Sequence, residues 1–159
     1  MNIFHDEHVL ILKVLLEHDV DFLLVGGVAV NFYGFPRPTG DLDVWLKPDQ
    51  DNRAKLVKAM VELNILGDDI DRLRKCDFSQ AVVFHLGTTP PFVIDFMTRI
   101  AGLDWDDAYK MRVEAVSNDL KVAFLHLNHL KQNKLLAGRP KDQEDLRQLI
   151  RIEELKKAK

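Results

Sequence analysis

The chain has 159 residues, of which 47% are hydrophobic and 30% are charged, and its formal net charge is −3. This composition is typical of one globular domain with a sizeable core, and the longest apolar runs, such as residues 22–30, are too short to cross a bilayer. The single cysteine, Cys76, excludes an internal disulfide, and the acidic start lacks the regions of a signal peptide, so we expect a cytoplasmic protein.

The first 63 residues alternate between helical and extended patterns. Apolar residues at helical spacing predict an amphipathic helix at the start, and the two prolines that flank Arg37 predict a loop. In chain order, the predicted elements are a helix over 5–19, a strand over 22–25, a helix over 28–33, a loop over 35–40, a strand over 41–47 and a helix over 51–63.

The second part of the chain begins with a polar connection over residues 67–78, which has room for a helical turn. Two apolar strands follow, and the Gly and Pro residues at 87–91 predict that they form a hairpin. From residue 124 the pattern is helical, with a break at residues 137–140. In chain order, the predicted elements are strands over 81–86 and 92–97, a helix over 104–111 with Asp104 as its N-cap, a minor strand over 113–116, and helices to the end.

Strands and helices therefore mingle through the first two thirds of the chain, and helices finish it. The pattern predicts an α+β fold, that is, a mixed sheet that carries acidic side chains on one face and packs helices against the other. We expect a core over residues 1–120 and a helical C-terminal extension over residues 121–159, packed together as one structural unit.

Asp41 and Asp43 are the most informative acidic residues of the chain. Because a strand repeats every two residues, both project from one face, while Leu42 and Val44 face the opposite way. Two neighbouring carboxylates repel, and inside a protein this arrangement is stable chiefly around a bound cation. Four other Asp-x-Asp pairs lie in polar or helix-starting stretches, so the strand context singles out this pair and the spacing does not.

Gly26 and Gly27 follow a strand directly and precede a short helix. Glycines permit a positive φ and a close approach to the backbone, and the helix that follows offers free N–H groups to an anion. The alternative is a tight strand-to-helix turn without a ligand. The chain has neither the Lys-Ser/Thr pair of a Walker A loop nor the third glycine of a dinucleotide fingerprint.

Asp95 lies in the middle of an apolar strand, where an aspartate without a partner is costly to bury. If this strand neighbours the one that carries Asp41 and Asp43, three carboxylates converge. Three acids can hold two magnesium ions, which activate an attacking oxygen and stabilise a leaving pyrophosphate. The alternative is a single aspartate that is hydrogen-bonded to an arginine or to loop amides.

Basic residues supply the other charged candidates. Arg37 is held between two prolines, where it is ready for a phosphate or, alternatively, for a structural salt bridge that fixes the loop. Lys134, Lys141 and Asp142 lie around the helix break in the Lys- and Arg-rich segment 131–159. From the residues alone, this block is interpreted as a solvated helix start, with Asp142 in the first turn favoured by the helix dipole.

The order of these motifs resembles the DNA polymerase β-type nucleotidyltransferase superfamily: Gly-Gly, then Asp-x-Asp on a strand, then a further strand aspartate. More narrowly, the stretches GGVAVNFYGFPRPTGDLDVWL and NKLLAGRPKDQEDL together resemble small bacterial and archaeal nucleotidyltransferases, among them the AbiEii-like toxin group. The resemblance runs from about Phe22 to Leu149 and so covers most of the chain.

The resemblance assigns roles to the residues of the first stretch and to the later strand. Gly26 and Gly27 would cradle the triphosphate of a nucleotide. Asp41 and Asp43 would bind two Mg²⁺ ions, and Asp95 would be the third metal-binding acid, which polarises the acceptor hydroxyl.

It also assigns roles to the basic block. Lys134 would meet triphosphate oxygens, with Lys141 and Arg37 as further nucleotide-binding residues, and Asp142 matches a later acidic motif of the group. One departure is that many superfamily members place a serine after the first glycine, where its hydroxyl can contact a phosphate, whereas this chain reads Gly26-Gly27-Val28. Triphosphate binding would then rely on backbone groups and basic side chains.

The resemblance implies an enzyme that transfers a nucleoside monophosphate from a Mg²⁺-bound nucleoside triphosphate to an acceptor hydroxyl. RNA, a protein and a small molecule remain open as acceptors, and an antitoxin partner would follow from the toxin-like group. Two alternatives keep the same acids: a catalytically silent module that binds a nucleotide or a partner, and a metal-dependent phosphohydrolase.

Overall fold

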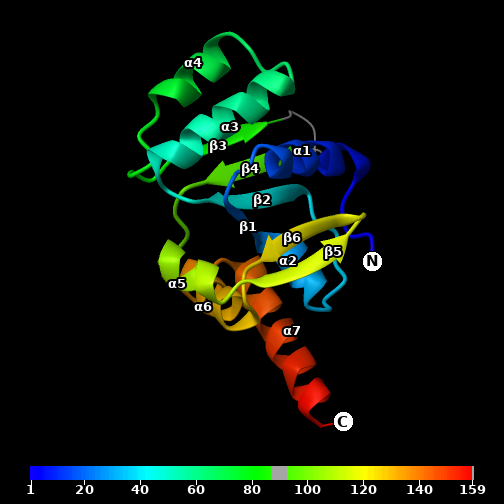
Figure 1. Ribbon diagram of the computed structural model, residues 1–159. Coiled ribbons are helices and arrows are strands. Elements are labelled where there is room, and N and C mark those ends of the chain that lie inside the picture. The colour runs from blue at the N-terminus through cyan, green and yellow to red at the C-terminus, as the bar shows by residue number, and fades with distance from the viewer. Residues whose placement is uncertain (87–92, 159) are drawn as a thin grey trace.

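The computed structural model describes residues 1–86 and 93–158 (Figure 1). In chain order, its elements are α1 (Asp6–Glu17), β1 (Phe22–Val25), α2 (Gly26–Phe32), β2 (Asp41–Leu46), α3 (Gln50–Glu62), α4 (Asp68–Lys75), β3 (Val83–Leu86), β4 (Val93–Met97), α5 (Trp105–Lys110), β5 (Val113–Ser117), β6 (Leu120–Phe124), α6 (Leu127–Ala137) and α7 (Pro140–Lys157).

The strands form one mixed sheet in the order β3-β4-β2-β1-β6-β5. β2 runs parallel to β4, and β1 runs parallel to β6, whereas the other neighbours are antiparallel. The predicted α+β fold with a mixed sheet is therefore confirmed. The antiparallel pairing of β3 with β4 fits the predicted hairpin, whose turn lies outside the described residues.

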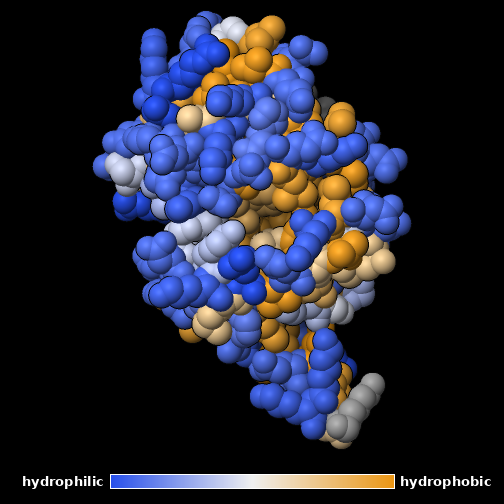
Figure 2. All heavy atoms as spheres, in the orientation of Figure 1, coloured by the Kyte–Doolittle hydropathy of each residue, from blue (hydrophilic) through white to orange (hydrophobic). Residues whose placement is uncertain are grey.

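Helices cover both faces of the sheet, and not only the face away from the acids as expected. Figure 1 shows α1, α3 and α4 on one side, and α2, α5, α6 and the protruding α7 on the other. On the side of the molecule that Figure 2 shows, hydrophobic side chains gather in the middle, where α1 and the β5–β6 hairpin lie, while much of α7 is hydrophilic.

The alternation of β2 positions the acids. Leu42 and Val44 are almost completely buried in the hydrophobic core, whereas Asp41 and Asp43 point from the opposite face and are only partly covered. Trp45 lies on the same face as the two acids, but it is buried beneath Trp105 of α5, with the ring centroids 5.2 Å apart. Its indole N–H donates to the carbonyl of Thr98, which fixes the segment that follows β4.

Two elements differ from the sequence prediction. α4 is a complete helix where only a turn was expected, and β6 was not predicted at all. Asn118 and Asp119 both adopt a positive φ and connect β5 to β6 in a two-residue turn, a type of turn in which Asn and Asp are common. The predicted boundary between residues 120 and 121 falls inside β6, and the division into core and extension stays a prediction.

Among the described residues, none of the helices is long and apolar enough to span a membrane.

Candidate active site

The three predicted acids meet on one face of the sheet. β2 and β4 pair in parallel, so that Asp43 lies directly beside Asp95, and Asp41 lies two residues earlier on the same face. The edge strand β3 adds His85, whose register partner on β4 is also Asp95. The structure therefore brings Asp41, Asp43 and Asp95 together, as their strand contexts suggested.

Gly26 is required by the position of Asp43. Its φ is +65°, a conformation that residues with a side chain rarely adopt, and a Cβ atom there would lie 1.9 Å from Oδ2 of Asp43. Gly27 has an ordinary φ, but a Cβ atom there would lie 2.8 Å from Cγ2 of Thr39 and 3.4 Å from Nη2 of Arg37. The Gly-Gly turn thus lets the backbone that begins α2 approach both an acid and a cation.

Burial and neighbouring charges raise the pKa values of Asp43 and Asp95. Burial, followed by the charge of Asp95, raises the pKa of Asp43 to about 6, while Lys134 and Lys141 oppose the shift. Burial also raises the pKa of Asp95, together with the charge of Asp41 and a hydrogen bond to it. Such shifts mark a site in which the charged form of a carboxylate lacks sufficient compensation from the protein.

The donor set suits a hard divalent cation. Magnesium prefers carboxylate oxygens, and a cation between Asp41, Asp43 and Asp95 would relieve the repulsion that adds to burial in raising the pKa values of Asp43 and Asp95. Among the described residues, no three or more Asp, Glu, His or Cys side chains are already grouped closely enough to hold a metal ion. The strand positions and the carboxylate chemistry of the three acids fit such an ion.

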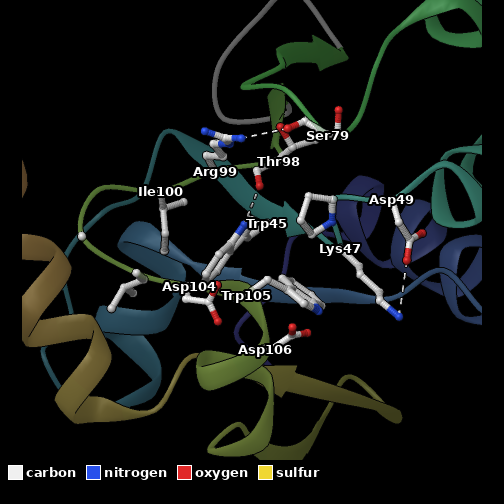
Figure 3. Close-up of a pocket in the computed structure, with 13 residues that line it drawn as sticks. Trp45, Lys47, Asp49, Ser79, Thr98, Arg99, Ile100, Asp104, Trp105 and Asp106 are labelled. Atoms are coloured by element: carbon white, nitrogen blue, oxygen red, sulfur yellow. Dashed lines mark hydrogen bonds and ion pairs between the residues drawn. The ribbon is translucent and has the colours of Figure 1, made fainter.

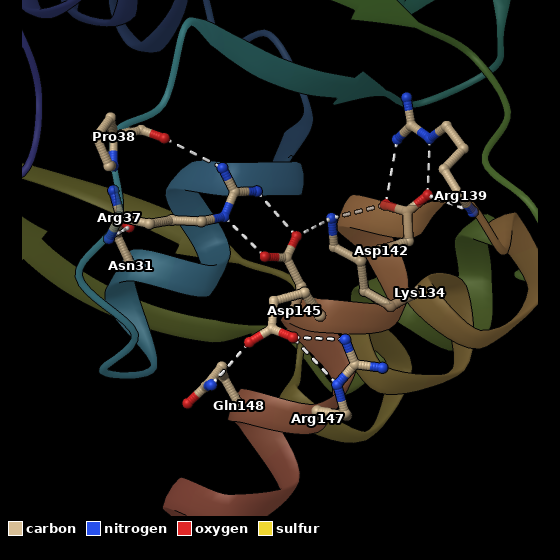
Figure 4. A network of polar contacts seen from close by, with 10 residues as sticks. Asn31, Arg37, Pro38, Lys134, Arg139, Asp142, Asp145, Arg147 and Gln148 are labelled. Atoms are coloured by element: carbon tan, nitrogen blue, oxygen red, sulfur yellow. Dashed lines mark hydrogen bonds and ion pairs between the residues drawn. The ribbon is translucent and has the colours of Figure 1, made fainter.

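A second set of charges lies across from the acids. The charged network, which we define as Arg37, Lys134, Arg139, Asp142 and Asp145, joins the loop before β2 to α6 and α7 (Figure 4). Nε and Nη2 of Arg37 donate to the two carboxylate oxygens of Asp145 at 2.7 and 2.8 Å. The structural salt bridge considered for Arg37 is therefore present.

Lys134 occupies the centre of the charged network. Its ammonium lies 3.1 Å from Oδ1 of Asp142 and 2.9 Å from Oδ2 of Asp145, and only 4% of its side chain is exposed. Asp142 also accepts from the backbone N–H and the side chain of Arg139, in a capping box at the start of α7. The prediction that Lys134 and Asp142 bind the nucleotide stays a prediction.

A cleft of about 550 Å³ separates the acids from the charged network. Its lining includes both glycines, all three acids, and the cations Arg37, Arg99, Lys134, Arg139 and Lys141. Lys141 lies close enough to lower the pKa values of both Asp43 and Asp95. The cleft therefore has a negative wall on the sheet and a positive wall on α6, α7 and the loop before β2.

A second hollow of about 700 Å³ adjoins the cleft (Figure 3). Arg99 and Ile100, in the segment that follows β4, line both spaces. The floor of the hollow is formed by Trp45 and Trp105, and Asp104 and Asp106 lie at the start of α5 beside it. A molecule in this hollow would reach the acids along the sheet face on which Trp45 follows Asp43.

Sequence reasoning missed several residues of the site. Asp145 belongs to the charged block around the helix break but was given no role, although its spacing of three from Asp142 places both on one face of α7. Arg99 carried no motif, since its exposure beside both hollows depends on the path of the chain after β4. His85 lies on an edge strand, and its alignment with Asp95 depends on the strand register.

Comparison with known proteins identifies the fold. No family model matches the chain, and no curated protein matches its sequence. Among solved structures, the lincosamide antibiotic adenylyltransferase LnuA bound to lincomycin is similar, with a TM-score of 0.57 and 15% identity over 96% of this chain and 99% of LnuA. The chain has the fold of nucleotidyltransferases.

Two further structures support this result. An antigenic nucleotidyltransferase-like protein from Paracoccidioides brasiliensis has a TM-score of 0.52 and 17% identity, over 94% of this chain and 75% of that one. A candidate nucleotidyltransferase from Thermotoga maritima has a TM-score of 0.50 and 16% identity, over 94% of this chain and 96% of that one. At such identities the similarity establishes the fold, and the activity must be argued from the site.

Proposed function

We propose that the protein is a metal-dependent nucleotidyltransferase, which moves a nucleoside monophosphate from a triphosphate to an acceptor hydroxyl. The observation that carries the proposal is the register of β2 and β4, which lines up Asp41, Asp43 and Asp95 beside the Gly-Gly turn. A fold shared with nucleotidyltransferases supports it. Similarity to the AbiEii-like group remains part of the proposal, as does work in the cytoplasm.

The two walls of the cleft would bind different parts of the Mg²⁺-bound triphosphate. Asp41, Asp43 and Asp95 would hold two Mg²⁺ ions, which supply Lewis-acid activation of the attacking oxygen and charge neutralisation of the leaving pyrophosphate when bound. The backbone at Gly26 and Gly27 passes so close to Asp43 and Thr39 that a Cβ atom at either glycine would clash, so this turn would present only main-chain groups to the phosphates. Cations of the opposite wall, including Arg37 and Lys141, would orient the triphosphate oxygens.

Asp95 is best placed to receive the proton of the acceptor hydroxyl. It is only partly buried, and burial together with Asp41 raises its pKa, so it is a stronger base than a free aspartate. The acceptor oxygen would bond to the α-phosphorus as the bond from this phosphorus to the bridging oxygen breaks. The electron pair leaves with pyrophosphate, and the nucleotide remains on the acceptor.

The adjoining hollow would be the approach for the acceptor, because it shares Arg99 and Ile100 with the cleft that Asp95 lines. RNA, a protein hydroxyl and a small molecule remain candidates, and an antitoxin partner remains part of the same proposal. LnuA, whose structure holds lincomycin, is an adenylyltransferase that acts on a small antibiotic, and a small-molecule acceptor for this chain has that precedent in the fold.

A transfer assay tests the proposal. The protein is incubated with Mg²⁺, triphosphates labelled at the α-phosphate, and separate pools of RNA, protein and small hydroxyl compounds. We expect labelled acceptor and released pyrophosphate with the wild type, and neither with Asp43→Asn. Equal labelling by both proteins would reject the mechanism, and free nucleoside monophosphate in place of labelled acceptor would indicate a phosphohydrolase.

A further inference from the structure

The charged network has an excess of one positive charge that nothing within it balances. Arg37, Lys134 and Arg139 carry three positive charges, whereas Asp142 and Asp145 carry two negative charges. Burial opposes the ionised form of both carboxylates, but hydrogen bonds from the surrounding cations hold the pKa values of Asp142 and Asp145 below the usual range. The network therefore stays ionised at neutral pH, and its surplus faces the cleft.

Exposure decides which cations can meet a ligand. The side chains of Asp142 and Asp145 are 1% exposed and that of Lys134 is 4% exposed, whereas Arg37 is 24% and Arg139 is 62% exposed. A guanidinium has five N–H donors, and each arginine spends only part of its set on its aspartate. The N–H groups that remain are the donors this wall offers to the cleft.

We infer that Asp142 and Asp145 are positioning residues, which aim the guanidinium groups of Arg139 and Arg37 at the phosphates of the substrate. Lys134 is the buried cation that lets two carboxylates lie side by side behind the arginines. Phosphate oxygens therefore meet Arg37 and Arg139 in preference to Lys134. This inference rests on the proposed function, since it names the phosphate-binding groups of the same cleft.

The geometry favours a role for Asp142 and Asp145 in orienting the arginines over a purely structural role, in which they would only join α7 to its neighbours. Asp145 holds Arg37 through two parallel bonds, which fix the plane of the guanidinium as well as its place. Arg37 lies over the Gly-Gly turn, since its Nη2 atom is 3.4 Å from where a Cβ of Gly27 would be. Asp142 holds Arg139 in the same manner on the other side of Lys134, so the two forks flank the cleft with fixed orientation.

The test measures binding of Mg²⁺-tripolyphosphate, which carries the phosphate chain without a base, by calorimetry at a temperature where every variant is folded. We expect Arg37→Met and Arg139→Met each to weaken binding about 10- to 100-fold, as for loss of a charge-assisted bond. Arg147→Met is the matched control, since Arg147 lies on α7 and pairs with the exposed Glu144, away from the cleft lining. We expect this control to bind as the wild type does.

Positioning is separated from a purely structural role by a double-mutant cycle. Asp145→Asn should weaken binding, but Arg37→Met/Asp145→Asn should bind no more weakly than Arg37→Met alone, because Asp145 acts through Arg37. Additive losses, or full affinity in Asp145→Asn, would overturn the positioning role. The effect of removing Lys134 is measured in Lys134→Met/Asp145→Asn, which removes one charge of each sign. This double variant can be used even if Lys134→Met alone does not fold.

The outcomes also separate this inference from the proposed function. If the wild type binds Mg²⁺-tripolyphosphate and both arginine variants bind it equally well, the inference is wrong and the proposed function stands. If Lys134→Met/Asp145→Asn loses far more affinity than Asp145→Asn, Lys134 is itself the phosphate ligand and the inference is wrong. If the wild type binds neither this probe nor any nucleoside triphosphate, the proposed function fails as well.

Discussion

Asp43 should reduce the stability of the metal-free protein at neutral pH. Burial and the neighbouring Asp95 raise its pKa from 3.8 to about 6, so the folded protein holds this proton more tightly than the unfolded chain does. The stability that the protonated form contributes is complete below pH 4 and is lost as the pH rises through 6. An asparagine resembles the protonated acid and keeps that contribution at every pH.

The raised pKa of Asp43 determines how large the change in the free energy of unfolding should be. Each pKa unit corresponds to about 1.4 kcal/mol, so a shift of about two units gives roughly 3 kcal/mol as an upper estimate. For a chain of this length, each kcal/mol moves the melting temperature by about 2–4 °C. Asp43→Asn should therefore melt roughly 6–12 °C above the wild type at pH 7.5 without divalent ions, while its transfer activity is lost.

Thermal and urea unfolding of both proteins between pH 4 and pH 8, in the presence of a chelator, measure this difference. The gap in the free energy of unfolding should be near zero at pH 4, grow between pH 4 and pH 6, and then stay level. Asp51→Asn is a control, since Asp51 is exposed in the first turn of α3. An Asp43→Asn protein that is no more stable than the wild type at pH 7.5, or a gap that does not depend on pH, would refute this reasoning.

Three further predictions concern individual residues. In urea unfolding, Gly26→Ala should destabilise the protein by more than the roughly 1–2 kcal/mol of backbone strain at positive φ, because the new Cβ would lie 1.9 Å from Oδ2 of Asp43. The excess should shrink in an Asp43→Ala background. Gly40→Ala is the control, since the space around a Cβ at Gly40 is open. Asn52→Ala should cost about 2–4 kcal/mol in the same measurement, because its buried amide joins both backbone groups of Asp21 to the carbonyl of Lys47, and an unchanged midpoint would contradict this role. Asp95→Asn should fold normally yet lose about 10²–10⁴-fold in transfer rate, and a rate within a few-fold of the wild type would exclude Asp95 as the proton acceptor.

The acidic wall of the cleft could be predicted from local patterns. The alternation of β2 places Asp41 and Asp43 on one face, and the apolar neighbours of Asp95 identify its strand. The glycines could be recognised as a turn, but the reason for Gly26 depends on the distance to Asp43, which only the pairing of β1 with β2 determines. Short-range periodicity therefore predicts which acidic side chains belong to the site, but it does not predict the distances between the residues of the site.

The charged network could not be predicted in the same way. Asp145 contacts Arg37 across 108 positions of the chain, and no local pattern marks such a pair. Lys134 reads as an ordinary helix residue, and its burial follows from how α6 packs against α7 and from the two carboxylates that surround its ammonium. β6 was overlooked because Asn118 and Asp119 were not recognised as a hairpin turn.

Under the proposed function, the acids and the opposing cations together bind one Mg²⁺-bound triphosphate. Calorimetric titration with each of the four common nucleoside triphosphates, with Mg²⁺ and with a chelator in its place, tests this without knowledge of the acceptor. We predict that at least one triphosphate binds the wild type at a ratio of one to one only with Mg²⁺, and that Asp41→Asn/Asp43→Asn does not show this binding. Equal affinity of the two proteins, or binding that is indifferent to Mg²⁺, would contradict the account.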